Sequence, residues 1–351
     1  MTLEVYLSDF LVDLNDYEIS PNEISRGSFG SVKEGWKKEK DGKRGEHVAV
    51  KTLLEPATRQ KEQVDLIREL HILAKLNHPS CLKLLGFVLP DKENDHTVII
   101  TQFMPNGTLE QALKAMTNGN PYPNFDATKQ TCSLFGICST MQFLHSQRII
   151  HRDFKPANVF LNSDYEIVIA DFGFSKLVEE NADLTCNIGS PVFMAPELYS
   201  DDYDHITNAI DVYAFGVTLY LYFVSAPTEL DDNKGKIRSH QHLMMRVMKG
   251  ARLLRKPSIP DPIWNIIHQC FHADPEKRPT FSDLANMFET NENLWFEGTE
   301  KEKYLEYVQR IKDATQKGMG NDFVKAIIDP RPHPIEPQPK KEPKKHKGRN
   351  W

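Results

Sequence analysis

The chain has 351 residues, of which 40% are hydrophobic and 26% are charged, and this composition is typical of a globular protein large enough for two lobes or domains. The formal net charge of −6 is unevenly spread, because residues 329–351 carry seven Lys or Arg against three Asp or Glu, a net of +4, and the preceding residues therefore carry −10. An acidic body argues against nonspecific nucleic-acid binding as the main role.

The cysteine pattern and the two longest uncharged stretches indicate the compartment. Five cysteines with no Cys-x-x-Cys pair and no Cys/His cluster at zinc spacing predict reduced thiols. Met1 is not followed by a basic segment, so no signal peptide is expected. Residues 130–147 are rich in polar side chains and residues 212–228 are slightly short for a span, so both are predicted to be buried core helices. We expect a cytoplasmic protein without a membrane span, with nuclear import through the basic tail as the alternative.

The first part of the chain has the pattern of a small sheet with one helix. Residues 1–16 are expected to form a short extension, and the run Val48-Ala49-Val50-Lys51 is β-prone. Residues 64–76 have helical spacing, and Asn77-His78-Pro79 is expected to end this helix. The apolar stripe of the helix consists of Leu66, Leu70 and Leu73.

A turn separates this part from a helix-rich second part. Residues 98–101 form a further predicted strand, which leads to the turn signal Pro105-Asn106-Gly107. We interpret this turn as a hinge between an N-lobe at residues 17–104 and a C-lobe at residues 105–290.

The second part has a helical pattern interrupted by a hairpin at residues 149–172. Residues 291–328 are expected to add one or two helices. Residues 329–351, with six prolines and a lysine-rich run, cannot bury a core and are expected to be disordered. One face of the added helices is formed by Tyr304, Tyr307, Val308 and Ile311.

The hairpin carries a dense group of polar side chains. Asp153, Lys155 and Asn158 place a carboxylate, an ammonium and a carboxamide within six positions, and Asp171 follows the next strand-like segment. Two oxygen ligands brought together by a short hairpin suit a hard cation such as Mg²⁺, which prefers few protein ligands plus substrate phosphate. Asp153, just upstream of both oxygen ligands, is placed to meet a hydroxyl nucleophile.

This arrangement resembles the catalytic loop and the metal loop of the protein-kinase family. The resemblance implies an α+β, bilobal fold, with a small strand-rich N-lobe that contains one key helix and a larger helical C-lobe. It also implies ATP-dependent phosphoryl transfer, with Asp153 as the catalytic base and Lys155 steadying the transferring phosphate. The implied ligands of Mg²⁺, with Mn²⁺ as the alternative cation, are Asn158 and Asp171. The implied stack of side chains that aligns the lobes is His151, Phe172, Leu73 and Leu84.

Residues 25–32 resemble the kinase glycine-rich loop, although Ser25 replaces its first glycine. Glycines in such a loop let backbone N–H groups approach phosphate oxygens closely. By the same resemblance Lys51 pairs with Glu69, which borders the apolar stripe of the helix and therefore needs a cation; both are assigned to catalysis. The implied nucleotide-binding residues are Gly27, Gly30, Val32, Ala49, Lys51, Thr101, Gln102, Met104 and Phe160.

Residues 189–197 resemble the end of a kinase activation segment, and Glu197 is expected to pair with Arg278. Asp211, at the start of an apolar stretch, is expected to cap backbone groups of the catalytic loop. Arg152 lies next to the base and needs an anion, which a phosphate in the activation segment would supply. The implied regulatory residues are Arg152, Thr185 and Ser190.

The acceptor specificity rests on mixed signals. Lys155-Pro156 and Ser190 resemble serine/threonine kinases, whereas residues 100–104 and 211–216 have the character of tyrosine kinases. The mixture resembles the tyrosine-kinase-like group of serine/threonine kinases. The implied partners are protein substrates with Ser or Thr acceptors and an activating kinase, which is either an upstream enzyme or a second copy acting in trans. Two alternatives stay open: a pseudokinase scaffold, favoured only by Ser25, and a dual-specificity kinase.

Overall fold

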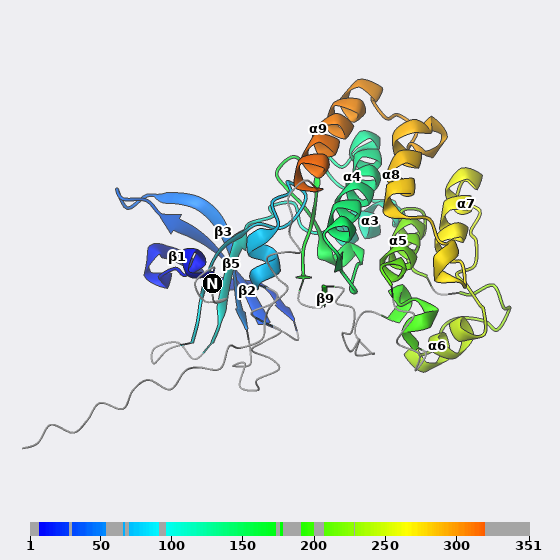
Figure 1. Cartoon of the computed structure of the whole chain (residues 1–351), viewed down its shortest axis with the longest axis horizontal. Coiled ribbons are helices and arrows are strands. Elements are labelled where there is room, and N and C mark those ends of the chain that lie inside the picture. The colour runs from blue at the N-terminus through cyan, green and yellow to red at the C-terminus, as the bar shows by residue number, and fades with distance from the viewer. Residues whose placement is uncertain are drawn as a thin grey trace, which may run out of the picture.

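The computed structural model describes residues 7–27, 30–53, 66, 70–90, 96–172, 176–177, 191–199, 207–227 and 229–319. A strand-rich lobe and a helical lobe lie at opposite ends of the molecule (Figure 1). The predicted α+β, bilobal architecture is confirmed. The tail at residues 329–351, expected to be disordered, lies outside the described residues.

The N-lobe is built on a five-stranded sheet with the order β1-β2-β3-β5-β4, in which every neighbouring pair is antiparallel. Val48 and Val50 of β3 are buried on one face, while Ala49 and Lys51 point to the opposite face, as the two-residue period of a strand requires. The strands are β1 Tyr17–Gly27, β2 Gly30–Lys38, β3 Arg44–Leu53, β4 Leu84–Val88 and β5 Val98–Gln102.

One helix of the N-lobe supplies core side chains to the sheet. Residues 70–75 are helical, and the helix ends before Asn77-His78-Pro79 as predicted. Leu70 and Leu73 are buried in the main hydrophobic core, whereas Leu66 packs against it in a partly buried position.

The segment before β1 covers the outer edge of the sheet. Leu7 is buried, and Leu11 forms a parallel bridge with Phe87 of β4. The backbone N–H of Val12 donates to the Phe87 carbonyl at 3.2 Å. Two short 3₁₀ helices, η1 Ser8–Phe10 and η2 Leu14–Asp16, belong to this segment.

Seven helices are described in the C-lobe and its extension. Side-chain oxygens cap several of them: Thr108 and Gln111 form a capping box at one helix, Thr280 and Asp283 form another, and Asp126 caps a third. The helices are α3 Leu109–Thr117, α4 Ala127–Ser146, α5 Ala209–Leu221, α6 His240–Met248, α7 Asp261–Cys270, α8 Phe281–Thr290 and α9 Lys301–Met319.

The two uncharged stretches form buried helices, as expected. α4 and α5 bury almost all of the residues along their middle turns. α5 ends at Leu221, earlier than the apolar stretch that runs to residue 228. Among the described residues, no helix combines the length and apolar character that crossing a bilayer requires.

Two small two-stranded antiparallel sheets and five 3₁₀ turns complete the described part of the C-lobe. β6 Ile149–Ile150 pairs with β9 Lys176–Leu177, and β7 Val159–Leu161 pairs with β8 Ile167–Ile169. The turns are η3 Pro156–Asn158, η5 Pro191–Phe193, η6 Pro196–Tyr199, η8 Pro275–Lys277 and η9 Glu292–Leu294.

α9 packs along α4, and its buried face is the one predicted from the sequence, Tyr304, Tyr307, Val308 and Ile311 (Figure 1). The contact is close because α4 has a glycine at its centre. A Cβ on Gly136 would lie 2.1 Å from Tyr307 Oη. That hydroxyl is buried and has no hydrogen-bond partner among the described residues.

We therefore expect Gly136→Ala to destabilise the protein, although alanine is the better helix former by about 1 kcal/mol. The added methyl group overpacks the α4–α9 contact, and the expected loss is about 1–3 kcal/mol in the free energy of unfolding by urea. Tyr307→Phe removes the obstructing hydroxyl, so the double variant should regain part of that loss. Equal losses in the single and double variants would contradict this explanation.

Candidate active site

The catalytic loop is fastened to the start of α5 by a buried carboxylate. Asp211 accepts the backbone N–H groups of His151 and Arg152, each at 2.9 Å. His145 Nε2 donates to the same carboxylate at 2.9 Å. Arg152 has a left-handed backbone with φ of 68°, a strained conformation that the two hydrogen bonds hold in place. The predicted capping role of Asp211 is confirmed.

The pKa of Asp211 reflects this environment. Burial disfavours the charged form and by itself raises the pKa, but the hydrogen bond and charge of His145 and the backbone N–H of His151 outweigh burial. The net effect lowers the pKa of Asp211 below its ordinary value of 3.8. The carboxylate is therefore ionised at neutral pH.

Asp153 lies at the centre of a compact polar group. Lys155 Nζ donates to Asp153 Oδ2 at 2.6 Å. Asn158 Nδ2 donates to the backbone carbonyl of Asp153 at 2.8 Å and to Oδ2 at 3.1 Å. The structure thus brings together the three polar residues of the predicted catalytic loop.

Asp171 is joined to this group through the backbone. The N–H of Ala170 donates to the carbonyl of Asn158 at 2.9 Å, which aligns the end of β8 with the catalytic loop. Asp171 itself has a left-handed backbone with φ of 62° and is only partly buried.

The donor set of these residues fits a hard divalent cation. The amide nitrogen of Asn158 is engaged by Asp153, which makes its oxygen the atom available to a metal. A carboxamide oxygen and the Asp171 carboxylate are hard ligands of the kind that Mg²⁺ binds when substrate and water complete its shell. Asn158 and Asp171 are therefore suited to hold Mg²⁺ or Mn²⁺.

The four side chains predicted to align the lobes are all buried. His151 Nε2 bonds to the Ala170 carbonyl at 3.0 Å, and its ring lies 5.4 Å from that of Phe172 between centroids. Leu73, Leu84 and Phe172 belong to one continuous core. This core passes from the N-lobe helix and β4 to the loop that carries Asp171.

The expected nucleotide-binding residues come from four strands of the N-lobe sheet, the segment after β5, and β7. In the sheet, Val32 pairs with Lys51 and Ala49 pairs with Thr101. A Cβ on Gly30 would lie 2.4 Å from the Thr52 carbonyl oxygen, so the close β2–β3 pairing already requires glycine there. The remaining members are Gly27 in β1, Gln102 in β5, Met104 after β5 and Phe160 in β7.

Several predicted site residues lie outside the described residues. They include the expected partner of Lys51 and the regulatory hydroxyls, so the predicted Lys51–Glu69 pair stays a prediction. These residues are Glu69, Thr185 and Ser190.

An ion pair between Arg278 and Glu197 fixes the segment at residues 191–199. Arg278 donates to both carboxylate oxygens of Glu197, at 2.6 and 2.8 Å; the Arg278 side chain is fully buried and that of Glu197 is 9% exposed. Arg278 also donates to the carbonyls of Ala209 and His272 at 3.0 Å. The predicted Glu197–Arg278 pair is confirmed, and its bidentate geometry is the strong form of such a contact.

One residue that shapes the site could not be predicted from the sequence. His145, in the last turn of α4, is the third donor to Asp211. Its position near a helix C-terminus is an ordinary one for a histidine, so the sequence offered no signal for this contact.

Comparison with known proteins identifies the family. A profile of the family described as protein tyrosine and serine/threonine kinase matches residues 19–288. The chain belongs to this kinase family. It is 30% identical to a probable serine/threonine-protein kinase of Dictyostelium discoideum, over 80% of this chain and 28% of the relative.

Relatives of the other acceptor class are equally similar to this kinase-family chain. It is 31% identical to the cytoplasmic tyrosine-protein kinase BMX of Mus musculus, over 76% of this chain and 38% of the relative. It is also 31% identical to the tyrosine-protein kinase JAK1 of Danio rerio, over 78% of this chain and 24% of the relative. The chain thus spans less than two fifths of the length of each relative.

We expect Asp211→Asn to destabilise the kinase fold by about 3 kcal/mol at pH 7, because an amide cannot satisfy three donors that face a carboxylate. The folded-state pKa of Asp211 lies below 3.8, so its stabilisation is complete above that pH and is lost as the pH falls below it. The difference between wild type and variant in urea unfolding should therefore be constant from pH 7 to about pH 4 and shrink at lower pH.

The matched control is Asp164→Asn, the same change at an exposed position on the β7–β8 turn, which should shift stability by less than about 0.5 kcal/mol. A loss for Asp211→Asn as small as that of the control would contradict the capping role.

Proposed function

We propose that this chain transfers the γ-phosphoryl group of ATP to serine or threonine hydroxyls of protein substrates. The observation that carries the proposal is the hydrogen-bonded group formed by Asp153, Lys155 and Asn158. The Ala170–Asn158 hydrogen bond joins this group to Asp171. A base, a cation and two metal-suited oxygens within one such group are what in-line phosphoryl transfer needs.

In the proposed reaction the substrate hydroxyl oxygen attacks the γ-phosphorus. The bond from that phosphorus to the bridging oxygen breaks, and ADP leaves with the electron pair. Asp153 accepts the hydroxyl proton. Lys155, which lies 2.6 Å from that carboxylate, donates to the oxygens of the transferring phosphoryl group. The cation held by Asn158 and Asp171 would neutralise the charge that develops on the phosphates.

We propose the strands of the N-lobe as the nucleotide-binding side. Lys51, held against the α- and β-phosphates by Glu69, would orient the nucleotide. The register that pairs Ala49 with Thr101 supports a continuous surface of small side chains beside the adenine. The other residues proposed to contact the nucleotide are Gly27, Gly30, Val32, Gln102, Met104 and Phe160.

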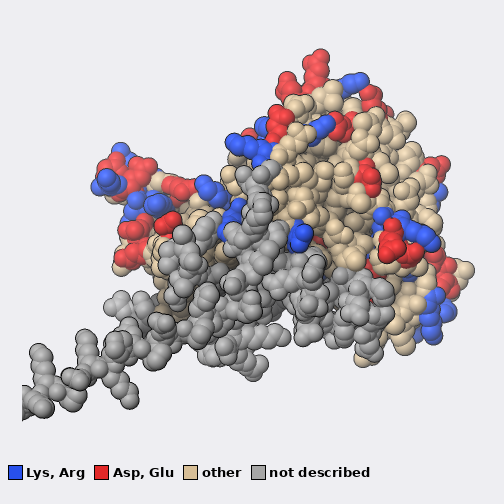
Figure 2. Space-filling model, in the orientation of Figure 1, with Lys and Arg blue, Asp and Glu red and all other residues tan. Residues whose placement is uncertain are grey.

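Serine/threonine specificity is the finer part of the proposal. It is supported by Lys155-Pro156, since the bond between Lys155 and Asp153 puts the ammonium beside the position where the acceptor hydroxyl would bind. On the face drawn in Figure 2, acidic and basic side chains are intermingled. This mixed charge supports protein substrates rather than nucleic acid. We propose a role in signalling inside the cell.

The test is an assay with purified protein, ATP labelled on the γ-phosphate, Mg²⁺ and a generic basic protein substrate, followed by phosphoamino-acid analysis. Asp153→Asn removes the base and should lower kcat by about 10²-fold or more. The same change at the exposed Asp164 should leave the rate unaltered. Phosphoserine or phosphothreonine supports the proposal. Phosphotyrosine as well would indicate dual specificity, and no transfer with ATP still bound would indicate a pseudokinase.

Regulation by phosphorylation is a further part of this proposal. We propose that a phosphate on Thr185 pairs with the guanidinium of Arg152, which is 7% exposed and precedes the base in the chain. Ser190 is proposed to contact the base and Lys155. Thr185→Ala should lower activity severalfold while leaving the ATP-induced shift in melting temperature intact. Thr290→Ala, at the exposed end of α8, is the control. Full activity of Thr185→Ala would overturn the regulatory role.

A further inference from the structure

α9 lies beyond residue 288, where the kinase-family match ends, yet one of its side chains is bonded to the interior of the kinase domain. Thr315 is 3% exposed, and its Oγ1 lies 3.0 Å from His78 Nε2 and 2.8 Å from Ser139 Oγ. His78 belongs to the loop between the N-lobe helix and β4, and Ser139 belongs to α4. Thr315 thus links three segments that are far apart in the sequence.

The direction of this link follows from the histidine. The backbone N–H of Ser80 donates to His78 Nδ1 at 3.1 Å, so Nδ1 is an acceptor and Nε2 carries the hydrogen. Burial lowers the pKa of His78 to about 4, so the ring is neutral at pH 7. His78 therefore donates a hydrogen bond to the Thr315 hydroxyl. The Thr315 hydroxyl also forms a hydrogen bond with the Ser139 hydroxyl.

The same histidine is clamped between the two helices. Its ring stacks on Phe143 of α4, with centroids 5.0 Å apart and planes inclined by 19°. A Cβ on Gly318 of α9 would lie 2.6 Å from the Phe143 ring, so glycine allows the end of α9 to close over this stack.

The loop that begins at His78 is paired with the end of β8. Ile169 N–H donates to the Ser80 carbonyl at 2.7 Å, and Leu82 N–H donates to the Ile169 carbonyl at 2.8 Å. Ile169 is two residues before Asp171. The intervening residue, Ala170, is bonded to the catalytic loop through Asn158 and His151.

We propose that Thr315 is a positioning residue for phosphoryl transfer: by holding His78, it fixes the loop at residues 78–82 against Ile169 and so fixes the placement of Asp171. The proposal rests on the function proposed above, in which Asp171 is a metal ligand. The proposal gives α9, a helix outside the kinase-family match, a role in the placement of Asp171.

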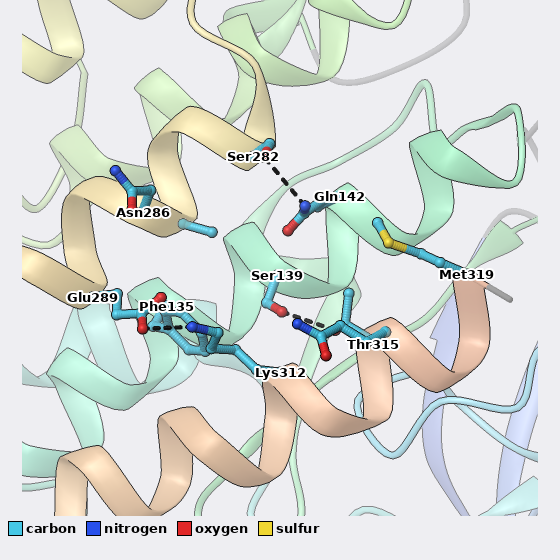
Figure 3. A pocket seen from close by; sticks show the side chains of 11 residues that line it. Phe135, Ser139, Gln142, Ser282, Asn286, Glu289, Lys312, Thr315 and Met319 are labelled. Carbon is cyan, nitrogen blue, oxygen red and sulfur yellow. Dashed lines mark hydrogen bonds and ion pairs between the residues drawn. The ribbon is translucent and has the colours of Figure 1, made fainter.

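A cavity beside Thr315 explains why a single hydroxyl matters here. About 180 Å³ of space lies between α4, α8 and α9, and Ser139 and Thr315 are on its wall (Figure 3). Polar contacts join the three helices around it. Lys312 pairs with Glu289 at 2.6 Å, and Gln142 donates to Ser282 at 3.2 Å.

The test compares two variants of α9 that each lose one buried hydroxyl. Thr315→Val has nearly the same volume and lacks the acceptor for His78. Tyr304→Phe loses the hydrogen bond to the Phe288 carbonyl, 2.8 Å long, which anchors α9 to α8 away from His78. Thr315→Ser keeps the hydroxyl and should behave as wild type.

The first measurement is hydrogen–deuterium exchange resolved to single amides, which requires neither ATP nor a metal. Exchange at the Leu82 and Ile169 amides should be about three- to tenfold faster in Thr315→Val, the range expected for one lost buried hydrogen bond, and unchanged in Tyr304→Phe. The second measurement is the Mg²⁺ concentration for half-maximal phosphoryl transfer, which should rise severalfold in Thr315→Val alone, with little change in the KM for the protein substrate.

The outcomes separate the two proposals. If wild-type protein transfers no phosphate, the proposed function fails, and the exchange measurement alone decides the link from Thr315 to Ile169. Unchanged exchange at both amides in Thr315→Val, or equal acceleration in Tyr304→Phe, overturns the link. If Thr315→Val does not fold, Ser139→Ala, which removes the other contact of the Thr315 hydroxyl, should accelerate the same two amides, and a failure to do so overturns the proposal.

Discussion

A fully buried carboxylate, that of Asp211, accepts the backbone N–H groups of His151 and Arg152 where the chain turns through a left-handed residue. The left-handed turn is unfavourable for a non-glycine residue, and the burial of a charge is unfavourable as well. The hydrogen bonds between the backbone and the carboxylate offset both costs. The charge is matched by three donors, and the strained backbone is fixed by two of them. Because the carboxylate stands in the first turn of a buried helix, the catalytic loop acquires the rigidity of the C-lobe core.

The polar group around Asp153 and Asp171 lies on short segments rather than on long helices or strands. Each segment is fixed by buried hydrogen bonds: the catalytic loop to α5, the loop that carries Asp171 to Asn158 and His151, and the segment that contains Glu197 to Arg278. Such tethers let a site combine freedom of backbone shape with fixed side-chain geometry. The arrangement also makes the site sensitive to changes that touch no substrate.

The sequence was sufficient for the parts of the fold that local patterns determine. The hairpin residues, the Asp211 cap, the Glu197–Arg278 pair and the buried face of α9 were all predicted, because they rest on motif spacing or on helical period. The domain boundaries stay a prediction. Contacts between distant segments could not be predicted. His78 and Thr315 are 237 residues apart, and neither has a neighbour that indicates the other. The roles of Gly136 and Gly318 could not be predicted either, since they depend on the packing of α9 against α4.

The segment at residues 7–16 covers the edge of the N-lobe sheet at β4. Leu11 bridges Phe87, the Val12 N–H takes up the Phe87 carbonyl on the free side of β4, and Leu7 is buried in the core. A chain shortened to the family match at residues 19–288 would expose that edge and the apolar side chains beneath it. An open, apolar strand edge is a template for pairing with other molecules. We therefore expect a chain cut at the boundaries of the family match to self-associate through the exposed edge of β4.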